Sequence, residues 1–160
     1  PICSLYGINY GVPVVSLRYF TVYGPRQRPD MGFHKFLRAA HLGEPITVYG
    51  DGEQTRDFTF VSDAVAATIA AGRQGPPGGI YNVGGGSRVS VNGVLTTIER
   101  LAGRPLVLRR EPAQKGDMRD TFADTTRART DLGFAPSKSL ESGLAAESEW
   151  IARLLLASKS

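Results

Sequence analysis

The fold class follows from one short apolar run, Pro13-Val14-Val15-Ser16-Leu17-Arg18-Tyr19-Phe20. Its β-branched and aromatic residues predict a strand that is buried on both faces, as in a parallel sheet. Residues 3–10 predict the end of a helix, which Gly11 caps and which Pro13 prevents from continuing. A helix, a tight turn and a buried strand in this order indicate an α/β unit that is already in progress. We therefore expect further chain before Pro1.

The rest of the chain predicts short strands and amphipathic helices. Apolar periodicity and turn residues indicate helices over residues 32–42, from 62 or 63 onward, and over 90–102, 124–132 and 140–156. Further strands are expected at residues 46–49, 56–61, 80–83 and 106–108. Two prolines and a glycine make residues 21–30 a predicted loop. The sequence therefore predicts a mixed α/β protein with one strand that needs additional neighbours.

N-caps are predicted for three of these helices, and core faces for two. Ser62 or Asp63 is the expected N-cap of one helix, Ser90 of the next, and Asp124 of a short one. The helix after residue 62 carries Val65, Ala66, Ile69 and Ala70 as its expected core face, and the last helix carries Leu144, Ile151, Leu154 and Leu155.

Composition argues against several classes of protein. No run of about 18 apolar residues is present, so we expect no membrane-spanning helix, and no signal peptide is visible. The single cysteine, Cys3, cannot form an internal disulfide, and His34 and His41 lack the partners of a zinc site. The net charge of +4 is spread along the chain without a basic helix. We therefore expect a cytoplasmic protein that binds no metal ion, nucleic acid or membrane.

Two polar clusters are candidate sites for a charged ligand. Thr21 directly follows the apolar run, where ligands bind in open α/β sheets, and Arg28 stands in a proline-stiffened loop. Tyr49 ends a strand and offers a ring for a base, while Arg56 can grip a phosphate with two hydrogen bonds. Asp57 could orient Arg56. A solvated loop and a surface ion pair explain the same residues, so both interpretations stay open.

A third cluster, Lys115-Gly116-Asp117, offers a carboxylate that can accept hydrogen bonds from ribose hydroxyls, although a charged turn explains it as well. The run Gly84-Gly85-Gly86 follows a predicted strand, but four residues separate it from the next helix. It therefore does not match a dinucleotide-binding loop.

Taken in order, these motifs resemble the extended short-chain dehydrogenase/reductase family, and within it the nucleotide-sugar 4-epimerases. The resemblance is carried by residues 16–31, 48–52, 56–63, 81–84, 115–117 and 123–124, and it covers the whole chain. It implies the C-terminal part of an NAD(P)-binding Rossmann fold with a smaller mixed α/β substrate-binding domain. Residues 1–24 would end the Rossmann domain. Residues 25–160 would mainly bind the sugar nucleotide, with about 57–73 returning to the Rossmann part.

The resemblance also implies roles for individual residues. Phe20 would lie near the nicotinamide of NAD, Thr21 would contact the sugar, and Arg28 would reach the sugar or the diphosphate. Phe33, Thr47 and Tyr49 would surround the uracil of a UDP-sugar, Arg56 would grip the diphosphate, and Asp117 the ribose.

The family's chemistry is a transient oxidation at the sugar C4, and its catalytic Tyr-x-x-x-Lys and Ser or Thr precede the strand that opens here. We therefore expect no catalytic residue in this chain, inactivity of the chain alone, and a homodimeric parent enzyme. Thr21, the Val-Tyr-Gly-Pro that follows it and the Arg-Pro-Asp-Met of residues 28–31 look more like UDP-glucuronate than UDP-glucose 4-epimerases. The alternatives are a related dehydratase or decarboxylase, and a non-catalytic sugar-nucleotide-binding module.

Overall fold

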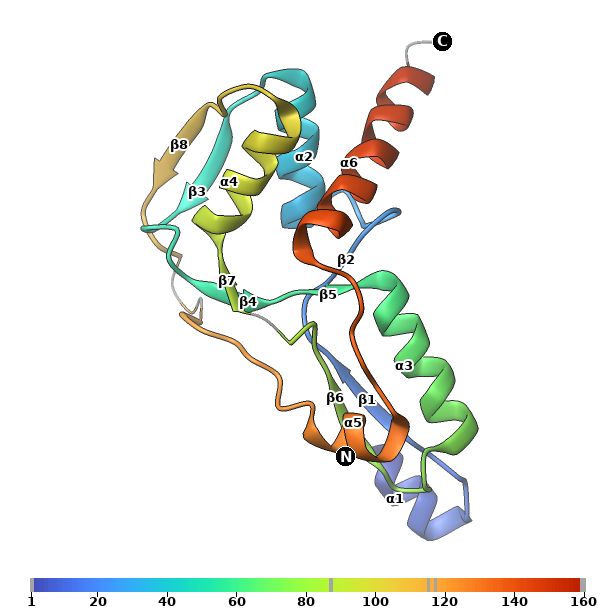
Figure 1. Ribbon diagram of the computed structural model, residues 1–160. Helices are drawn as coiled ribbons and strands as arrows, with labels where there is room; N and C mark the ends of the chain where they lie inside the picture. The colour runs from blue at the N-terminus through green and yellow to red at the C-terminus, as the bar shows by residue number, and fades with distance from the viewer. Residues whose placement is uncertain (1, 87, 115, 117, 159–160) are drawn as a thin grey trace. The chain divides into compact units, whose positions relative to one another are not determined.

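The computed structural model describes residues 2–86, 88–114, 116 and 118–158, without the side chain of Ser4. Its helices and strands alternate along the chain (Figure 1), which confirms the predicted α/β class. In order, they are α1 (Ile2–Tyr10), β1 (Ser16–Tyr19), β2 (Val22–Tyr23), α2 (Gly32–Leu42), β3 (Ile46–Tyr49), β4 (Thr55–Asp57), β5 (Thr59–Phe60), α3 (Val61–Gln74), β6 (Ile80–Val83), β7 (Arg88–Ser90), α4 (Val91–Ala102), β8 (Leu108–Glu111), α5 (Thr126–Leu132) and α6 (Leu140–Ala157).

The chain divides into two compact units, each assembled from separate segments. Unit 1 consists of Pro1–Val22, Asp57–Ser87 and Phe122–Ser137. Unit 2 consists of Tyr23–Arg56, Arg88–Thr121 and Lys138–Ser160. The assignment of these units to a cofactor-binding domain and a sugar-nucleotide-binding domain stays a prediction.

Unit 1 is built around a parallel pair of strands. β1 pairs with β6 in a register that sets Ser16 opposite Ile80 and Tyr19 opposite Val83. α5 packs against β6 and α3. These elements enclose an apolar core of Ala67, Ala71, Tyr81, Val83, Ala128, Leu132 and Phe134.

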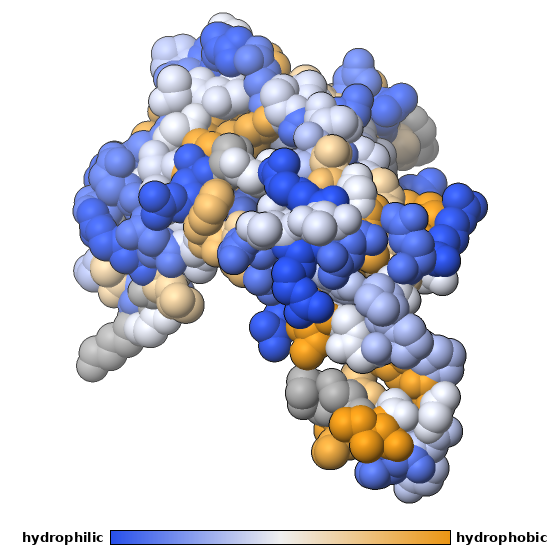
Figure 2. All heavy atoms as spheres, turned by 60° about the horizontal axis from the view of Figure 1, so that its bottom comes forward, coloured by the Kyte–Doolittle hydropathy of each residue, from blue (hydrophilic) through white to orange (hydrophobic). Residues whose placement is uncertain are grey.

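β1 is partly exposed in this chain. The strand spans four residues, and its last two, Arg18 and Tyr19, are exposed. Within the described residues, β6 is the strand that pairs with it, so its apolar surface lacks the cover that a wider sheet provides. The sequence predicts that this strand needs additional neighbours for burial on both faces, and its exposure in this chain agrees with that expectation. Figure 2, in which the lower part of Figure 1 is turned forward, shows apolar side chains at the surface of that part.

α3 buries a different face from the predicted one. Its core residues are Asp63, Ala64, Ala67 and Ala71, whereas Val65 and Ile69 are 51% and 47% exposed. Small alanines allow α3 to lie close to its neighbours, and this decides which face packs inward. The predicted cap is also wrong, because α3 begins at Val61, and the Asp63 carboxylate instead accepts hydrogen bonds from the amide and hydroxyl of Ser137 (3.2 and 3.0 Å).

Unit 2 packs α2 against α4 and α6, beside a parallel pair formed by β3 and β8. Leu37, Ile98, Leu144 and Ile151 are fully buried. As predicted, the Ser90 hydroxyl caps α4 by accepting from the amide of Gly93, and α2 ends at Gly43.

Several predicted boundaries need correction. The predicted loop 21–30 contains β2, and the predicted strand 56–61 is divided into β4 and β5. The division follows Asp57, whose carboxylate accepts hydrogen bonds from two backbone amides (3.1 Å each). β8 starts at Leu108, where its pairing with β3 begins. Thr125 occupies the N-cap position of α5, while the Asp124 carboxylate accepts from the first helical amide.

α6 spans nearly the residues predicted for the last helix, but the side chains of its C-terminal turns are more exposed than predicted. Leu154 is 44% exposed, so its predicted burial is wrong, whereas Leu144 and Ile151 are buried as predicted. No helix in the described part of the chain is long and apolar enough to span a bilayer.

Candidate functional site

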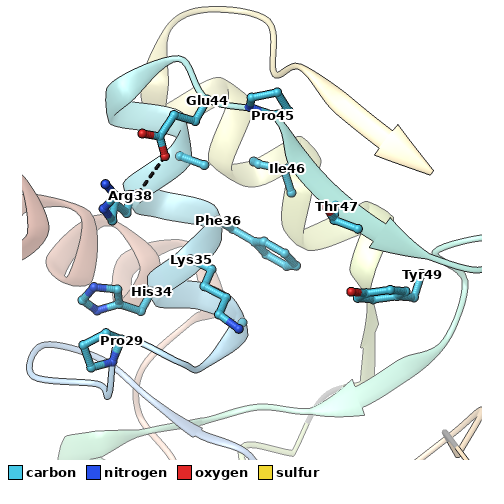
Figure 3. A pocket seen from close by; sticks show the side chains of 12 residues that line it. Pro29, His34, Lys35, Phe36, Arg38, Glu44, Pro45, Ile46, Thr47 and Tyr49 are labelled. Atoms are coloured by element: carbon cyan, nitrogen blue, oxygen red, sulfur yellow. Dashed lines mark hydrogen bonds and ion pairs between the residues drawn. The ribbon is translucent and has the colours of Figure 1, made fainter. Parts of the chain in front are cut away.

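A pocket of about 650 Å³ lies between α2 and β3 of unit 2 (Figure 3). Phe36 and Lys35 reach it from α2, Thr47 and Tyr49 from β3, and Pro29 from the loop before α2. Aromatic and aliphatic walls with a few polar groups are typical of small-molecule sites. The pocket therefore has the composition expected for a planar ring that carries polar edges.

The alternation of β3 explains why Thr47 and Tyr49 face the pocket. Successive side chains of a strand point to opposite faces. Ile46 and Val48 are buried at 2% and 1% exposure in the core beneath α4, whereas Tyr49 is 43% exposed. The backbone of Tyr49 is thus fixed in β3, whose alternate side chains are buried. The Tyr49 side chain remains accessible to a ligand that could stack on its ring.

The charged groups at this pocket are held at its rim. Arg38 pairs with Glu44 (2.7 Å), and both side chains are about half exposed. Lys35 is exposed on α2. An anionic part of a ligand could therefore be met by Lys35 without breaking a buried ion pair.

Tyr49 also lines a second, smaller cavity of about 300 Å³, with Gln54, Met118 and Arg119 among its other residues. Arg119 pairs with Asp51 at 3.2 Å, and Gln54 donates to the Tyr49 carbonyl at 3.0 Å. The amide of Glu53 and then Arg119 hold the pKa of Asp51 below its ordinary value. These contacts connect the residues after β3 to the segment around Arg119.

Among the residues predicted to bind the substrate, Thr47 and Tyr49 come together in one pocket. Phe33 does not join them: it is 5% exposed and packs edge-on against Tyr23 with ring centres 5.1 Å apart. Phe36, three residues later, is the phenylalanine of α2 that lines the pocket. Phe33 and Phe36 are three residues apart on one helix, so apolar periodicity alone could not separate the two.

The two predicted arginines lie in different settings. Arg28 is exposed and pairs with Asp30 at 3.0 Å, while its neighbour Pro29 lines the pocket. Arg56 is half-buried and donates to the carbonyls of Thr55 and Arg119 (2.8 and 3.3 Å). Asp117 and Lys115 lie outside the described residues.

Phe20 and Thr21 belong to unit 1, at the carboxyl end of β1. The amide of Phe20 donates to the Val83 carbonyl at 2.9 Å, and the Thr21 carbonyl accepts from the amide of Thr59 at 3.0 Å. Both side chains are half-buried. They occupy the edge of a parallel strand pair where α/β proteins bind ligands.

Asp57 has a structural part in unit 1. It is completely buried, and its carboxylate accepts from the amides of Gly86 and Ala123. A Cβ at Gly84 or Gly85 would collide with Asp57, Ala123 or the Phe58 carbonyl. The glycine run is therefore explained by close packing around this carboxylate. Within the described residues, no cluster of three or more His, Cys, Asp or Glu is placed to hold a metal ion.

Comparisons with known proteins point to one family. Residues 1–84 match the model of the NAD dependent epimerase/dehydratase family. The chain is 40% identical over 154 residues to an uncharacterized UDP-glucose epimerase, YtcB, of Bacillus subtilis, which covers 96% of this chain and 49% of that protein. It is 37% identical over 158 residues to the UDP-N-acetyl-alpha-D-glucosaminuronate decarboxylase of Bacillus cytotoxicus, covering 93% and 49%.

The structure resembles the crystal structure of UDP-glucuronic acid 4-epimerase from Bacillus cereus in complex with UDP-glucuronic acid and NAD. The TM-score is 0.92 at 39% identity, over 96% of this chain and 49% of that one. This likeness confirms the predicted fold, part of an extended short-chain dehydrogenase/reductase with a Rossmann domain. The chain spans about half the length of the curated relatives it matches. Because the family model covers more than half of its residues, the chain belongs to the NAD dependent epimerase/dehydratase family.

Proposed function

We propose that the chain is part of an NAD-dependent UDP-sugar 4-epimerase and that unit 2 binds the uridine end of the substrate. The observation that carries this proposal is the position of Tyr49, whose half-exposed side chain borders two cavities of unit 2. Base stacking on an aromatic ring is worth about 1–3 kcal/mol. The solved relative with UDP-glucuronic acid and NAD supports the same ligand class.

Each part of the UDP-sugar is assigned to particular residues of the chain. Tyr49 and Phe36 hold the uracil, and the Thr47 hydroxyl bonds to its polar edge. Arg56 binds the diphosphate by exchanging a carbonyl contact for a charge-assisted hydrogen bond, which is stronger. Arg28 reaches the sugar or the diphosphate by leaving its exposed pair with Asp30, a pair worth little in water. The ribose is assigned to Asp117.

The carboxyl end of β1 is the proposed contact with NAD and the sugar. Phe20 would lie against the nicotinamide and Thr21 against the sugar, because both stand where the β1–β6 pair ends. When bound, NAD supplies the transient oxidation at C4. Residues 1–24 and about 57–73 are then proposed to belong to the Rossmann part, and the catalytic residues to lie outside this chain.

UDP-glucuronate is the proposed substrate, with UDP-glucose as the second choice. A threonine hydroxyl at position 21 and an arginine from the loop that follows it in the sequence can meet the C6 carboxylate that distinguishes the two sugars. A decarboxylase is the second candidate function, favoured by the 37% identity to an enzyme named for that reaction. A homodimer, a cytoplasmic location and the absence of nucleic-acid binding stay predictions.

The test uses the full-length protein, by which we mean the natural polypeptide that contains this chain. Supplied with NAD, it should interconvert UDP-glucuronate and UDP-galacturonate much faster than UDP-glucose and UDP-galactose. Product analysis would also detect loss of carbon dioxide. Faster turnover of UDP-glucose would overturn the substrate assignment, and a decarboxylated product would favour the second candidate.

A further inference from the structure

Glu147, on α6, is a buried carboxyl group without an assigned role. Its side chain is 0% exposed. One oxygen, Oε2, accepts a hydrogen bond from the amide of Gly24 at 2.9 Å. The other, Oε1, is buried without a hydrogen-bond partner among the described residues. A buried carboxyl with one hydrogen bond is costly, so its presence here calls for an explanation beyond packing.

Gly24, whose amide donates to Glu147, is the first residue of the segment 24–31, which we call the 24–31 loop. Inside it, the amide of Gln27 donates to the Gly24 carbonyl at 3.0 Å, and the amide of Met31 to the Arg28 carbonyl at 3.1 Å. Arg26 has a positive φ of 71°, which is uncommon for a residue other than glycine. The loop therefore has one defined shape, set by turns within it.

The 24–31 loop is fixed at both ends. At its far end, the side-chain oxygen of Gln27 accepts from the amide of His34 in the first turn of α2, at 3.0 Å. At its near end, the bond from Gly24 to Glu147 is the link to α6. A Cβ at Gly143, one turn before Glu147, would collide with the ring of Tyr23. The chain at 23–24 thus lies directly on α6.

This loop forms part of the pocket. Pro29 lines the cavity that contains Tyr49, and Arg28 beside it is exposed. A small displacement of the loop would move both residues together, because its internal turns make it a single piece. The position of the pocket wall therefore depends on how the loop is anchored.

We propose that Glu147 is a positioning residue for the sugar-nucleotide site, which anchors the 24–31 loop through Gly24 so that Pro29 and Arg28 stand in place before the ligand binds. The proposal rests on the proposed function, since it assumes that the pocket binds a UDP-sugar. Glu147 itself does not touch the ligand. A wall that is already in place lowers the entropic cost of binding.

The surroundings of Glu147 make this anchor sensitive to pH. Burial raises the pKa of Glu147 to about 7, although the Gly24 amide opposes the shift. Four other charged or titratable groups on the packed helices bear on this shift. His41 bonds to Ser148, and on the outer side Arg38 pairs with Glu44 and Arg100 with Glu141. His34 packs edge-on against Trp150, and its buried Nδ1 has no hydrogen-bond partner among the described residues. Tyr23 donates to the Ser139 carbonyl at 3.4 Å.

Because the pKa in the anchored state is above its ordinary value, the anchored arrangement is favoured at low pH. It loses stability as pH rises through about 7, because burial disfavours the charged carboxylate. A glutamine at this position keeps an oxygen for the Gly24 amide and cannot ionise.

The test measures the affinity of the full-length protein for UDP-glucuronate by calorimetry, from about pH 5.5 to 8.5, a range in which this ligand keeps its charge. Glu147→Ala should weaken binding about tenfold at low pH, the effect of one hydrogen bond to a carboxyl. Glu147→Gln should bind like the wild type at low pH and show no decline at high pH, whereas the wild type weakens several-fold. The matched control is Glu149→Ala, an exposed carboxyl two residues further on α6.

A second readout does not need the ligand. Hydrogen exchange of the peptide covering residues 24–31 should accelerate in Glu147→Ala and stay slow in Glu147→Gln and Glu149→Ala. Unchanged exchange in a folded Glu147→Ala protein would overturn the proposal. If Glu147→Ala does not fold, a Glu147→Gln protein with the wild-type pH dependence would overturn it. Absence of UDP-glucuronate binding in the wild type would instead refute the proposed function, and the exchange result would stand by itself.

Discussion

Unit 1 and unit 2 differ in how they cover their apolar side chains. In unit 2, Leu37, Ile98 and Leu144 are at most 1% exposed, because α2, α4 and α6 pack against one another. In unit 1, Val65 and Ile69 on α3 are about half exposed, although their spacing predicts burial. Apolar periodicity thus marks a surface that is suited to burial without showing which residues bury it. It predicted burial correctly for Leu144 and Ile151 of unit 2, but not for Leu154 on the same helix.

The largest expected effect concerns catalysis, since the family's catalytic residues are proposed to lie outside this chain. The 160-residue chain with NAD and UDP-glucuronate should give no detectable epimerisation, while the full-length protein turns over. The measurement is product formation over hours, with the full-length protein as the positive control. Turnover by the chain alone would show that the division of labour proposed for the two units is wrong.

A pair of substitutions tests the difference in burial directly. Leu144→Ala in unit 2 should lower the free energy of unfolding by about 2–5 kcal/mol, because it leaves a cavity in a closed core. Ile69→Ala in unit 1 should change it by less than about 0.5 kcal/mol, as expected for an exposed position. Both are measured by urea unfolding of the chain. Equal losses would mean that α3 is covered as completely as α6.

Glu147 provides a third test, specific to unit 2. Its pKa of about 7 exceeds the ordinary 4.5, so the unfolded chain releases this proton at lower pH than the folded chain. Folding should therefore lose up to about 3 kcal/mol of stability as pH rises from about 4.5 to above 7. Glu147→Gln should remove this component. Unfolding curves at several pH values measure it, and an identical pH dependence in the two proteins would rule out a shifted Glu147.

The smallest effect should be on ligand affinity. Tyr49→Ala should weaken UDP binding by about tenfold, the lower part of the range for a base stacked on an aromatic ring. Tyr10→Ala is the matched control in unit 1, since Tyr10 is also exposed and lies on α1. Calorimetry with UDP measures both. A loss of affinity in the control, or none in Tyr49→Ala, would remove Tyr49 from the site.

Much of the local structure could be predicted from the sequence. Gly43 and Ser90 mark helix ends because each has a conformation or a hydrogen bond that its residue type favours. The alternation of residues 46–49 gave the two faces of β3, and with them the outward positions of Thr47 and Tyr49. These features depend on neighbours close in the chain.

What could not be predicted depends on contacts between distant segments. Phe33 and Phe36 lie on the same apolar stripe, and only the packing of Tyr23 decides that Phe33 belongs to the core. Glu147 carries no sequence signal, because its bond partner Gly24 is 123 residues away. Asp57 was expected beside Arg56, but the backbone of two other segments surrounds it.

Unit 2 is proposed to bind the uridine end of a UDP-sugar at Tyr49. The most direct test is an NMR titration of the chain with UDP-glucuronate, followed through assigned backbone amides. The account predicts saturable shifts centred on Thr47, Tyr49 and the residues around them in unit 2. No binding at millimolar ligand, or shifts confined to unit 1, would contradict it.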